Sequence, residues 1–362
     1  MNQEHSPLWH PSFKLNGLSF DSLISLHEFL ASMKIQGDQH ERDLAEFLTD
    51  WLSNDPLVVS YTSGTTGAPK KCFLSKEKMR LSAQTTGDFF QIGPGANALL
   101  CLPLSFIAGK MMVVRALVLG WDLHVVAPTK DALTQYDSNY DFVALVPHQL
   151  AFSYRALDKV KTLIVGGGVL PAHLEEKLQH SSVRAYATYG MTETLTHVAA
   201  RRLNGEERSE HYSAIPEVRF SSDARGCLQI HAPKLLEAPL VTNDLAEIID
   251  DQNFVYLGRI DDVINSGGVK HAPELIERKL KQYLMGDFII SSLPHQTLGE
   301  QIVLVKDMRG PSEESIYKAL ECLTPLERPK LILNLEELPV TDTGKYKRKE
   351  LKALIRNQKN GS

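Results

Sequence analysis

Short apolar runs alternate with helical patterns between Leu57 and Tyr189, and this alternation limits the possible fold more than any other feature. Strands that alternate with helices form mostly parallel sheets covered by those helices. We therefore expect an α/β fold. The predicted strands cover 57–61, 98–102, 122–127, 141–146, 161–165 and 183–189, and the predicted helices cover 76–90, 107–119, 147–157 and 171–179.

The residues at the ends of these helices fit the predicted bounds. Ser75 can cap the helix at 76–90, and Gly120 can end the helix that precedes it. Pro147 and Pro171 stand at the starts of the last two helices, where a missing N–H costs little.

Different patterns flank the alternating region. Upstream, residues 21–35 and 40–53 carry apolar stripes typical of amphipathic helices, with Asp21 as the expected N-cap of the first. Downstream, residues 219–257 predict short strands joined by turns, and the remainder mixes strands and helices. We expect a domain boundary between residues 258 and 259.

The composition excludes several classes of protein. The chain has 362 residues, 43% of them hydrophobic, and a net charge of −5, which favours neither a nucleic-acid nor an anionic-membrane partner. No run reaches the ~18 apolar residues of a membrane-spanning helix, and the N-terminus has no signal-peptide core. Four scattered cysteines without a CxxC pair indicate reduced thiols and a cytoplasmic location.

Residues 61–70 are the densest set of anion-binding groups in the chain. Four hydroxyl side chains, two glycines and a lysine stand together there, and such a loop can turn several N–H and hydroxyl groups toward one phosphate. The alternative is a Ser/Gly linker, but Lys70 and Lys71 lead directly into another apolar run. The glycine spacing is not that of a P-loop, and Gly166-Gly167-Gly168 lacks the third glycine of a dinucleotide site. The sequence predicts a nucleotide site of neither common type.

Three further segments carry groups that suit a nucleotide. The segment 189–194, Tyr-Gly-Met-Thr-Glu-Thr, offers a ring for a base, a hydroxyl for a phosphate and a carboxylate for Mg²⁺. Asp244, followed by Arg259, can bind ribose hydroxyls, although a surface-turn aspartate is the alternative. Lys345 ends a glycine turn that can aim one side chain. The basic residues after it suit the solvated face of a helix: Lys347, Arg348, Lys349 and Lys352.

In this order, these motifs resemble those of the adenylate-forming superfamily of acyl-CoA synthetases, adenylation domains and luciferases. The match runs from about Leu57 to Leu351 and includes Gly-Arg-Ile-Asp-Asp at 258–262 and Pro-x4-Gly-Lys at 339–345. The resemblance implies an AMP-binding domain at 1–258, with a shortened N-terminus, and a small mobile α+β lid at 259–362. It also implies that a carboxylate attacks ATP to give an acyl-adenylate and pyrophosphate, and that the thiol of CoA then displaces AMP.

The resemblance assigns a role to each matched residue. Lys345, Thr192 and Glu193 would be catalytic, with Lys345 bridging the reacting oxygens, Thr192 bonding the α-phosphate and Glu193 helping to bind Mg²⁺. Asp261 would be the hinge. The residues implied to hold ATP or AMP are Thr62, Ser63, Gly64, Thr65, Thr66, Gly67, Lys70, Gly167, Gly168, Tyr189, Gly190, Asp244 and Arg259. Those implied to border the CoA channel are Gly267 and Gly268.

The region expected to bind the acid departs from the superfamily pattern. Phe106 stands where a histidine is usual in Pro-Leu-Phe-His-x-x-Gly, so no gating role carries over. Arg115 follows within an apolar helix, where it can snorkel to the surface, pair with an internal acid or bind a second carboxylate of the substrate. Some o-succinylbenzoate–CoA ligases of menaquinone biosynthesis are similar here, with a basic residue at the matching spacing. This resemblance implies o-succinylbenzoate as the acid.

Other functions stay open at this point. A different aryl- or acyl-CoA ligase, a stand-alone adenylation domain that loads a carrier protein, and a nucleotide-binding protein without catalysis would share most of these motifs. The partners expected for the favoured ligase are small molecules, namely the carboxylic acid, ATP and CoA. A homodimer is also possible, because only about sixty residues precede the phosphate loop and an N-terminal subdomain is expected to be largely missing.

Overall fold

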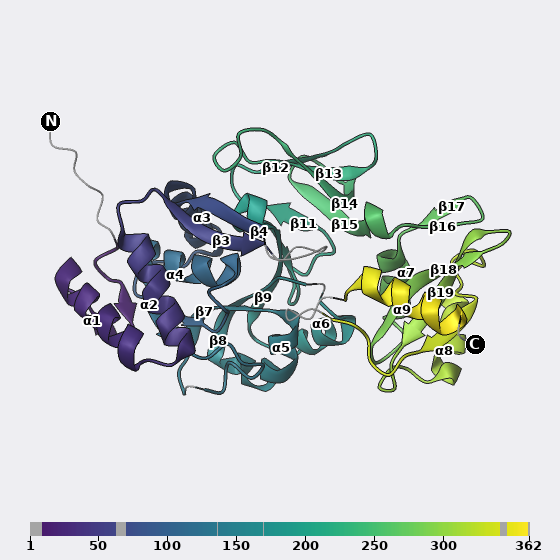
Figure 1. Ribbon diagram of the computed structural model, residues 1–362, viewed down its shortest axis with the longest axis horizontal. Helices are drawn as coiled ribbons and strands as arrows, with labels where there is room; N and C mark the ends of the chain where they lie inside the picture. Colours follow the sequence, from purple (N-terminus) through teal and green to yellow (C-terminus); the bar gives the residue numbers. More distant parts are fainter. Residues whose placement is uncertain (1–8, 63–69, 136, 169, 341–345, 361–362) are drawn as a thin grey trace. The chain divides into compact units, whose positions relative to one another are not determined.

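The structure is a computed structural model that describes residues 9–62, 70–135, 137–168, 170–340 and 346–360 (Figure 1). Its internal contacts divide the chain into two compact units. The first comprises the chain up to Gly166, Leu178–Arg219 and His231–Pro239, and the second comprises Gly167–Lys177, Phe220–Ile230 and the chain from Leu240. The boundary expected between residues 258 and 259 stays a prediction.

The first unit is built on a sheet whose central strands are parallel. The strand order in this unit is β11-β10-β9-β8-β7-β5-β6-β1-β2. The neighbours among β5 to β9 pair in parallel, whereas β10 is antiparallel to both β9 and β11. The predicted α/β fold is confirmed. The strands are β1 (Lys14–Leu15), β2 (Leu18–Ser19), β5 (Asn97–Leu100), β6 (Asp122–Val125), β7 (Tyr140–Leu145), β8 (Val160–Val165), β9 (Arg184–Gly190), β10 (His197–Arg202) and β11 (Tyr212–Ala214).

Helices connect and cover these parallel strands. Helix α4 packs on β5, β6 and α3, and α5 packs on β7. Ser75 caps α3 by accepting a hydrogen bond from the Lys78 N–H at 3.3 Å, and Gly120 ends α4 in the left-handed conformation, with φ of 73°. The helices of this unit are α3 (Lys76–Phe90), α4 (Ile107–Leu119) and α5 (Pro147–Ser153) with its 3₁₀ continuation η1 (Tyr154–Lys159). Helix α6 (Ala172–Leu178) follows β8 in the chain and belongs almost entirely to the second unit.

Two helices that pack against each other lie between β2 and β5 in the chain. They are α1 (Leu23–Gln36) and α2 (Gln39–Leu52), which lie side by side in Figure 1. The prediction of Asp21 as the N-cap of α1 is wrong. Ser22 takes that place, because its hydroxyl accepts from the Ser25 N–H at 3.1 Å while the Ser25 hydroxyl accepts from the Ser22 N–H at 3.3 Å.

The strand predicted at 57–61 is confirmed, but it belongs to a separate hairpin, so only its expected place in the parallel sheet is wrong. Among the described residues, strand β3 (Leu57–Thr62) pairs with β4 (Lys70–Ser75) alone, in antiparallel register. One face of this hairpin is buried, whereas Phe73 on the other face is 61% exposed. A strand with one solvent-exposed face is more typical of an antiparallel pair than of the interior of a parallel sheet.

The second unit contains two groups of strands. The first group lies in the order β12-β13-β14-β15, and the second has the order β17-β16-β19-β18 with β20 beside β19. The strands are β12 (Arg219–Ser222), β13 (Cys227–His231), β14 (Leu240–Ile248), β15 (Asn253–Arg259), β16 (Ile264–Ser266), β17 (Val269–His271), β18 (Phe288–His295), β19 (Gly299–Lys306) and β20 (Leu331–Asn334).

Helices cover both faces of the second group of strands. Phe288 and Ile290 of β18 pack into a cluster with Ile276 of α7, whereas Ile289 packs into a cluster with Leu351 of α9. Successive side chains of one strand therefore supply two apolar cores. The helices are α7 (Pro273–Leu280), α8 (Glu313–Ala319) and α9 (Arg348–Asn360), and the 3₁₀ turns of the chain also include η2 (Thr192–Thr194), η3 (Ile260–Asp262) and η4 (Leu320–Cys322).

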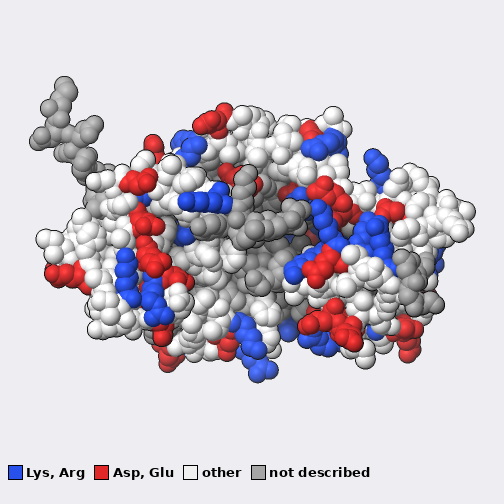
Figure 2. All heavy atoms as spheres, viewed as in Figure 1, with Lys and Arg blue, Asp and Glu red and all other residues white. Residues whose placement is uncertain are grey.

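The surface carries charges of both signs. On the face drawn in Figure 2, acidic and basic side chains lie interspersed. Within the described part of the chain, each helix is too short or too polar to cross a membrane.

Candidate active site

The segment after β9 forms a tight turn that presents two of the predicted catalytic side chains. The Thr194 hydroxyl donates to the Thr196 carbonyl oxygen at 2.7 Å and accepts from the Met191 N–H at 3.0 Å. Thr194 is fully buried, while Thr192 is half-buried and Glu193 is exposed. The buried hydroxyl thus fixes the turn and leaves the hydroxyl of Thr192 and the carboxylate of Glu193 accessible.

The absence of a side chain at Gly190 lets the two strands that flank this turn approach each other closely. A Cβ at this position would lie 2.6 Å from the Cα of His197 and would also meet the Thr196 carbonyl oxygen. Only glycine allows the end of β9 to approach the start of β10 so closely. The ring of the preceding Tyr189 packs edge-on against Tyr212, with 6.0 Å between the ring centroids.

The predicted phosphate loop joins the two strands of the β3–β4 hairpin. Thr62 and Lys70, at its two ends, are paired in register. The predicted binding residues Ser63, Gly64, Thr65, Thr66 and Gly67 lie outside the described residues. Burial, and then the negative charge of Glu193, raise the pKa of the Cys72 thiol on β4. The first unit therefore brings the Glu193 carboxylate close to the base of this loop.

Arg115 is buried on α4, with 3% of its surface exposed. Its Nη2 group donates to the Thr196 hydroxyl at 2.7 Å and lies 3.5 Å from Nδ1 of His197. Its Nε group donates to the Thr86 hydroxyl at 3.4 Å, and Nη1 has the sulfur of Met112 at 3.7 Å. Burial lowers the pKa of Arg115 to about 9, so the guanidinium keeps its charge at neutral pH.

Two of the three explanations predicted for Arg115 are wrong. The side chain does not snorkel, because it is almost fully buried. It does not pair with an internal acid either, since all its partners among the described residues are uncharged. The guanidinium is oriented, but no described side chain neutralises it, and the third explanation, binding of a second carboxylate of the substrate, stays a prediction.

Two residues of this cluster were missed at the sequence level, Thr196 and His197. The available signal was weak: two polar residues in an otherwise apolar run, directly after the Thr-Glu-Thr segment. Nothing local placed them beside Arg115. Phe106, by contrast, stands at the N-cap of α4, where its ring cannot accept a hydrogen bond from the helix.

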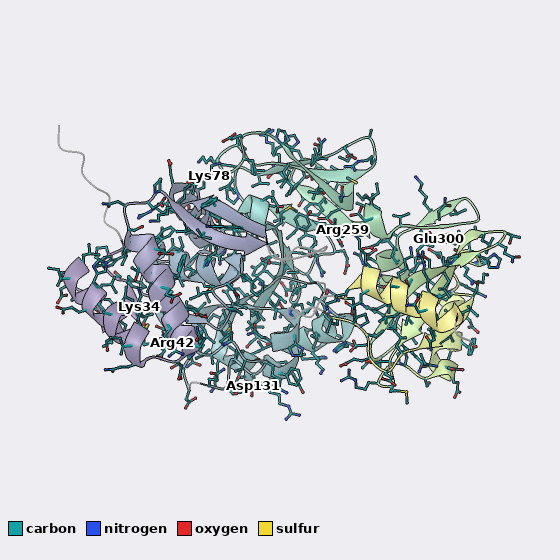
Figure 3. All side chains as sticks on the ribbon, in the orientation of Figure 1. Lys34, Arg42, Lys78, Asp131, Arg259 and Glu300 are labelled. Atoms are coloured by element: carbon teal, nitrogen blue, oxygen red, sulfur yellow. The ribbon has the colours of Figure 1, made fainter. Side chains whose placement is uncertain are left out.

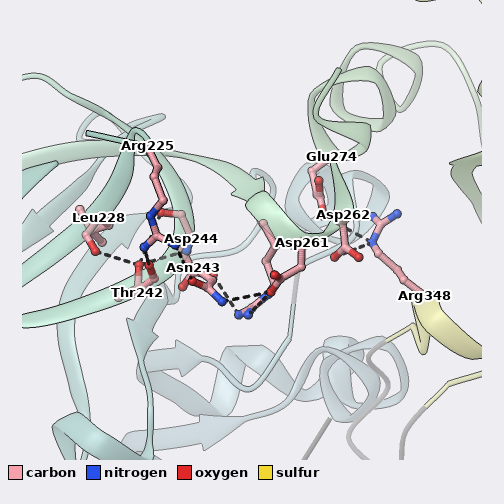
Figure 4. A network of polar contacts seen from close by, with 10 residues as sticks. Arg225, Leu228, Thr242, Asn243, Asp244, Asp261, Asp262, Glu274 and Arg348 are labelled. Carbon is pink, nitrogen blue, oxygen red and sulfur yellow. Dashed lines mark hydrogen bonds and ion pairs between the residues drawn. The ribbon is translucent and has the colours of Figure 1, made fainter. Parts of the chain in front are cut away.

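The predicted ribose-binding residues lie together in the second unit, where Figure 4 labels Asp244. Asp244 of β14 and Arg259 of β15 are register partners, and Arg259 Nη1 donates to Asp244 Oδ1 at 3.2 Å. The alternative of a surface-turn aspartate is wrong, because Asp244 lies within a strand and is 7% exposed. Arg259, labelled in Figure 3, is also bonded to the predicted hinge residue, through Nη2 to Asp261 Oδ2 at 3.0 Å. The side chain of Asn243 donates to the same Asp261 oxygen at 3.3 Å.

Other predicted site residues lie in the turns of the second unit. Gly267 and Gly268, with φ of 62° and 82°, form the turn between β16 and β17, and Gly167 has φ of 77°. These values favour glycine at all three positions. Gly168 is half-buried beside Gly167, and Lys345 lies outside the described residues.

The expectation that Arg348 lies on a solvated basic face is wrong. Its guanidinium lies 2.9 Å from Glu277, 3.3 Å from Glu274 and 3.9 Å from Asp262, and Figure 4 shows the last two of these carboxylates around it. Burial lowers the pKa of Arg348, but the carboxylates, Glu277 foremost, outweigh this and raise it. Three carboxylates offset the cost of withdrawing the guanidinium from water, so α9 can turn this residue inward.

The other basic residues near the C-terminus agree better with the prediction. Lys347 and Lys349 are exposed, and Lys352 is half-buried and pairs with Glu300 at 2.9 Å (Glu300 is labelled in Figure 3). Among the described residues, no three or more His, Cys, Asp or Glu side chains gather closely enough to hold a metal ion.

Comparison with known proteins places this chain among enzymes that bind AMP. The AMP-binding enzyme family matches residues 23–218. A 2-succinylbenzoate–CoA ligase of Salmonella typhimurium is 25% identical over 68% of this chain and 56% of its own length, and one of Bacillus cytotoxicus is 26% identical over 88% and 72%. The chain thus spans little more than half of the Salmonella relative.

Solved structures give the same result. An acyl-CoA synthetase (AMP-forming)/AMP-acid ligase II-like protein from Dyadobacter fermentans is 32% identical, with a TM-score of 0.61 over 91% of this chain and 98% of that one. An o-succinylbenzoate coenzyme A synthetase from Bacillus subtilis, in complex with ATP and magnesium ion, has the same fold, with a TM-score of 0.68 at 20% identity over 81% of this chain and 69% of that one. The chain belongs to the AMP-binding enzyme family.

Proposed function

We propose that this protein is an ATP-dependent acid–CoA ligase that acts on an acid with two carboxylates, and that this acid is o-succinylbenzoate. It would convert o-succinylbenzoate, ATP and CoA to o-succinylbenzoyl-CoA, AMP and pyrophosphate, a step of menaquinone biosynthesis. The relatives named 2-succinylbenzoate–CoA ligase support this choice of acid.

The proposal rests on the surroundings of Arg115, whose guanidinium is buried among uncharged groups. A charged guanidinium is costly to bury beside uncharged groups alone, and an anion is its natural complement. Nη1 is the nitrogen best placed to receive it, since its one described partner is the thioether of Met112, a weak acceptor. Arg115 also bonds Thr196, four residues after Thr192, so an acid held there would lie near the turn proposed to bind the phosphates.

The proposed reaction has two steps. In the first, a carboxylate oxygen of the acid attacks the α-phosphorus of ATP and the bond to pyrophosphate breaks. In the second, the thiol of CoA attacks the acyl carbon, loses its proton and displaces AMP. Both the nucleophile and the phosphate of the first step are anionic, so charge and positioning dominate the barrier.

The chain supplies groups suited to each part of this reaction. Thr192 would bond the α-phosphate, Asp244 and Arg259 would hold the ribose, and Lys345 would bring positive charge to the reacting oxygens in the first step. Mg²⁺ commonly binds one carboxylate together with substrate phosphates, and the exposed carboxylate of Glu193 fits that arrangement and would let the ion neutralise phosphate charge.

Turnover of o-succinylbenzoate tests the proposal directly. The purified protein is incubated with the acid, ATP, Mg²⁺ and CoA, and the products are identified by mass spectrometry. We expect o-succinylbenzoyl-CoA, AMP and pyrophosphate in equal amounts. A thioester formed only from other acids would indicate another aryl- or acyl-CoA ligase, and release of product only with a phosphopantetheinylated carrier would indicate an adenylation domain.

Lys345→Ala tests the proposed division of labour. The variant should lose adenylate formation, measured by pyrophosphate release, yet still form thioester from supplied acyl-adenylate, because the lysine acts in the first step alone. Lys347→Ala, an exposed lysine nearby, is the matched control. Equal loss of both half-reactions in Lys345→Ala would contradict the proposed role.

A further inference from the structure

A second polar side chain stands beside Arg115 and has no assigned role. His197 begins β10, is 6% exposed, and packs edge-on against the ring of Phe90 at 5.7 Å between centroids. It lies at the junction of the turn that carries Thr192 and Glu193 with the helix that carries Arg115. A buried imidazole at such a junction is either packing alone or a group that faces the substrate.

The partners of His197 determine which of its nitrogens carries the proton. Nδ1 lies 3.5 Å from Arg115 Nη2 and 3.3 Å from the Thr196 hydroxyl. An arginine can only donate, so Nδ1 must accept, and the hydroxyl of Thr196 can accept from Arg115 while it donates to Nδ1. The proton of the neutral ring therefore lies on Nε2.

The ring is neutral at physiological pH. Burial, and then the positive charge of Arg115, lower the pKa of His197 well below its ordinary value. Nε2 is buried and has no hydrogen-bond partner among the described residues. A buried N–H donor without a partner costs free energy, unlike a donor at the surface, which water satisfies.

We propose that His197 is a specificity-determining residue that donates its Nε2–H to the same carboxylate that Arg115 attracts. The guanidinium supplies the charge, and the neutral imidazole supplies a second, directional hydrogen bond from a neighbouring element. The inference rests on the proposed function and narrows it, because an acid that lacks the second carboxylate would leave both donors unpaired. The pair thus favours acids with a second carboxylate over monocarboxylic acids of the same shape.

Two amide substitutions separate the functions of the two ring nitrogens. Asn places its amide near the position of Nδ1, so His197→Asn keeps an acceptor for Arg115 but loses the donor at Nε2. Gln reaches the position of Nε2, so His197→Gln keeps that donor. His197→Leu keeps apolar packing and loses both. Each variant is assayed by ATP–pyrophosphate exchange with o-succinylbenzoate and with 4-oxo-4-phenylbutanoate, which has the same skeleton without the ring carboxylate.

We expect His197→Leu and His197→Asn to raise the KM for o-succinylbenzoate by about tenfold or more, while the KM for ATP and for the monocarboxylate change little. His197→Gln should restore the KM for o-succinylbenzoate to within about threefold of the wild type. A core histidine that only packs would give a different result: the variants would shift the thermal midpoint and change both acids alike.

The outcomes separate this inference from the proposed function. If the wild type uses o-succinylbenzoate and all three variants keep its KM, the inference is overturned and the ligase remains. If the wild type activates only acids without a second carboxylate, or no acid at all, both are overturned. Rescue by Gln and not by Asn supports the inference, and rescue by Asn alone would show that His197 serves only to hold Arg115.

Discussion

Arg115 and Arg348 are both withdrawn from water, but their surroundings are opposite. Arg348 has three carboxylates around one guanidinium, and Arg115 has two hydroxyls, a thioether and an imidazole. The pKa of Arg348 is raised by its acids against the effect of burial, whereas burial alone lowers that of Arg115. Arg348 is therefore a structural contact whose charge is neutralised within the fold, whereas Arg115 is the residue that we propose binds a carboxylate of the substrate.

Replacing Arg348 should have the largest effect on stability. Arg348→Met leaves Glu277, Glu274 and Asp262 without their counter-charge, and the loss of one partner of a buried pair costs about 3–5 kcal/mol. Chemical denaturation, with hydrogen exchange in α7 and α9, measures the effect. Lys349→Met, at the exposed neighbour, should change the free energy of unfolding by less than about 0.5 kcal/mol. A loss below about 1 kcal/mol for Arg348→Met would contradict the conclusion that Arg348 and its carboxylates form a structural contact that Arg115 lacks.

Because three carboxylates surround the single guanidinium of Arg348, the free energy of unfolding should depend on pH. Burial raises the pKa of Glu274 from 4.5 to about 7; Arg348 opposes this shift, whereas Glu277 and Asp262 add to it. The carboxyl also faces Tyr256 of β15. Since the folded-state pKa lies above the ordinary value, the folded state holds a proton that the unfolded state has released. Stability is then full below about pH 4.5 and is lost as pH rises toward 7.

Glu274→Gln should remove this pH dependence. Relative to the wild type, the variant should gain on the order of 2–3 kcal/mol of unfolding free energy between pH 4.5 and 7.5. Denaturation curves across this range measure the difference. Glu350→Gln, at an exposed position on α9, is the control and should follow the wild type. Parallel curves for Glu274→Gln and the wild type would show that the pKa of Glu274 is the same in the folded and unfolded states.

Replacing Arg115 should affect acid binding and leave stability nearly unchanged. Arg115→Met leaves no buried charge behind, so the free energy of unfolding should stay the same or rise. The KM for o-succinylbenzoate should rise about 10- to 100-fold, as expected for a lost hydrogen bond to a charged group, with no change in the KM for ATP. Arg115→Lys should be intermediate, because lysine keeps the charge and loses the planar donor fork. Unchanged KM values for both substrates would remove the argument for a bound anion.

The smallest effect is expected at the half-exposed pair of Lys352 and Glu300. Lys352→Met should cost at most about 1 kcal/mol, since partly solvated ion pairs contribute little. Thermal denaturation at low and high salt measures this loss. If Lys352→Met cost as much stability as Arg348→Met, the number of carboxylates around a basic side chain would not determine how strongly that side chain stabilises the fold.

The sequence predicted those parts of the fold that depend on local signals. The bounds of α3 and α4 agree with the prediction, because Ser75 and Gly120 act within one turn of the helix that they cap or end. The place of β3 was not predictable in this way. Its pairing depends on which of its faces is covered, and the short apolar run 57–61 looks the same in a hairpin and in a parallel sheet.

The candidate site shows the same limit. Each motif was visible by itself, but the partners of Arg115 lie 29 and 81 residues away along the chain, and Glu277 lies 71 residues from Arg348. One arginine looked exceptional and the other ordinary, and nothing in their neighbours in sequence distinguished an acid-lined site from an uncharged one. Long-range packing made that difference.

The near-contact at Gly190 has a consequence for how substrate preference can change. Main-chain atoms, and not rotamers, set the gap between β9 and β10, so under the proposed roles the backbone would fix the distance between Thr192 and the group that Arg115 binds. Under the proposed roles, exchanging side chains at 115 or 197 would alter which chemical group is accepted at the far end of the acid. Accepting a longer or shorter acid would require moving the backbone itself.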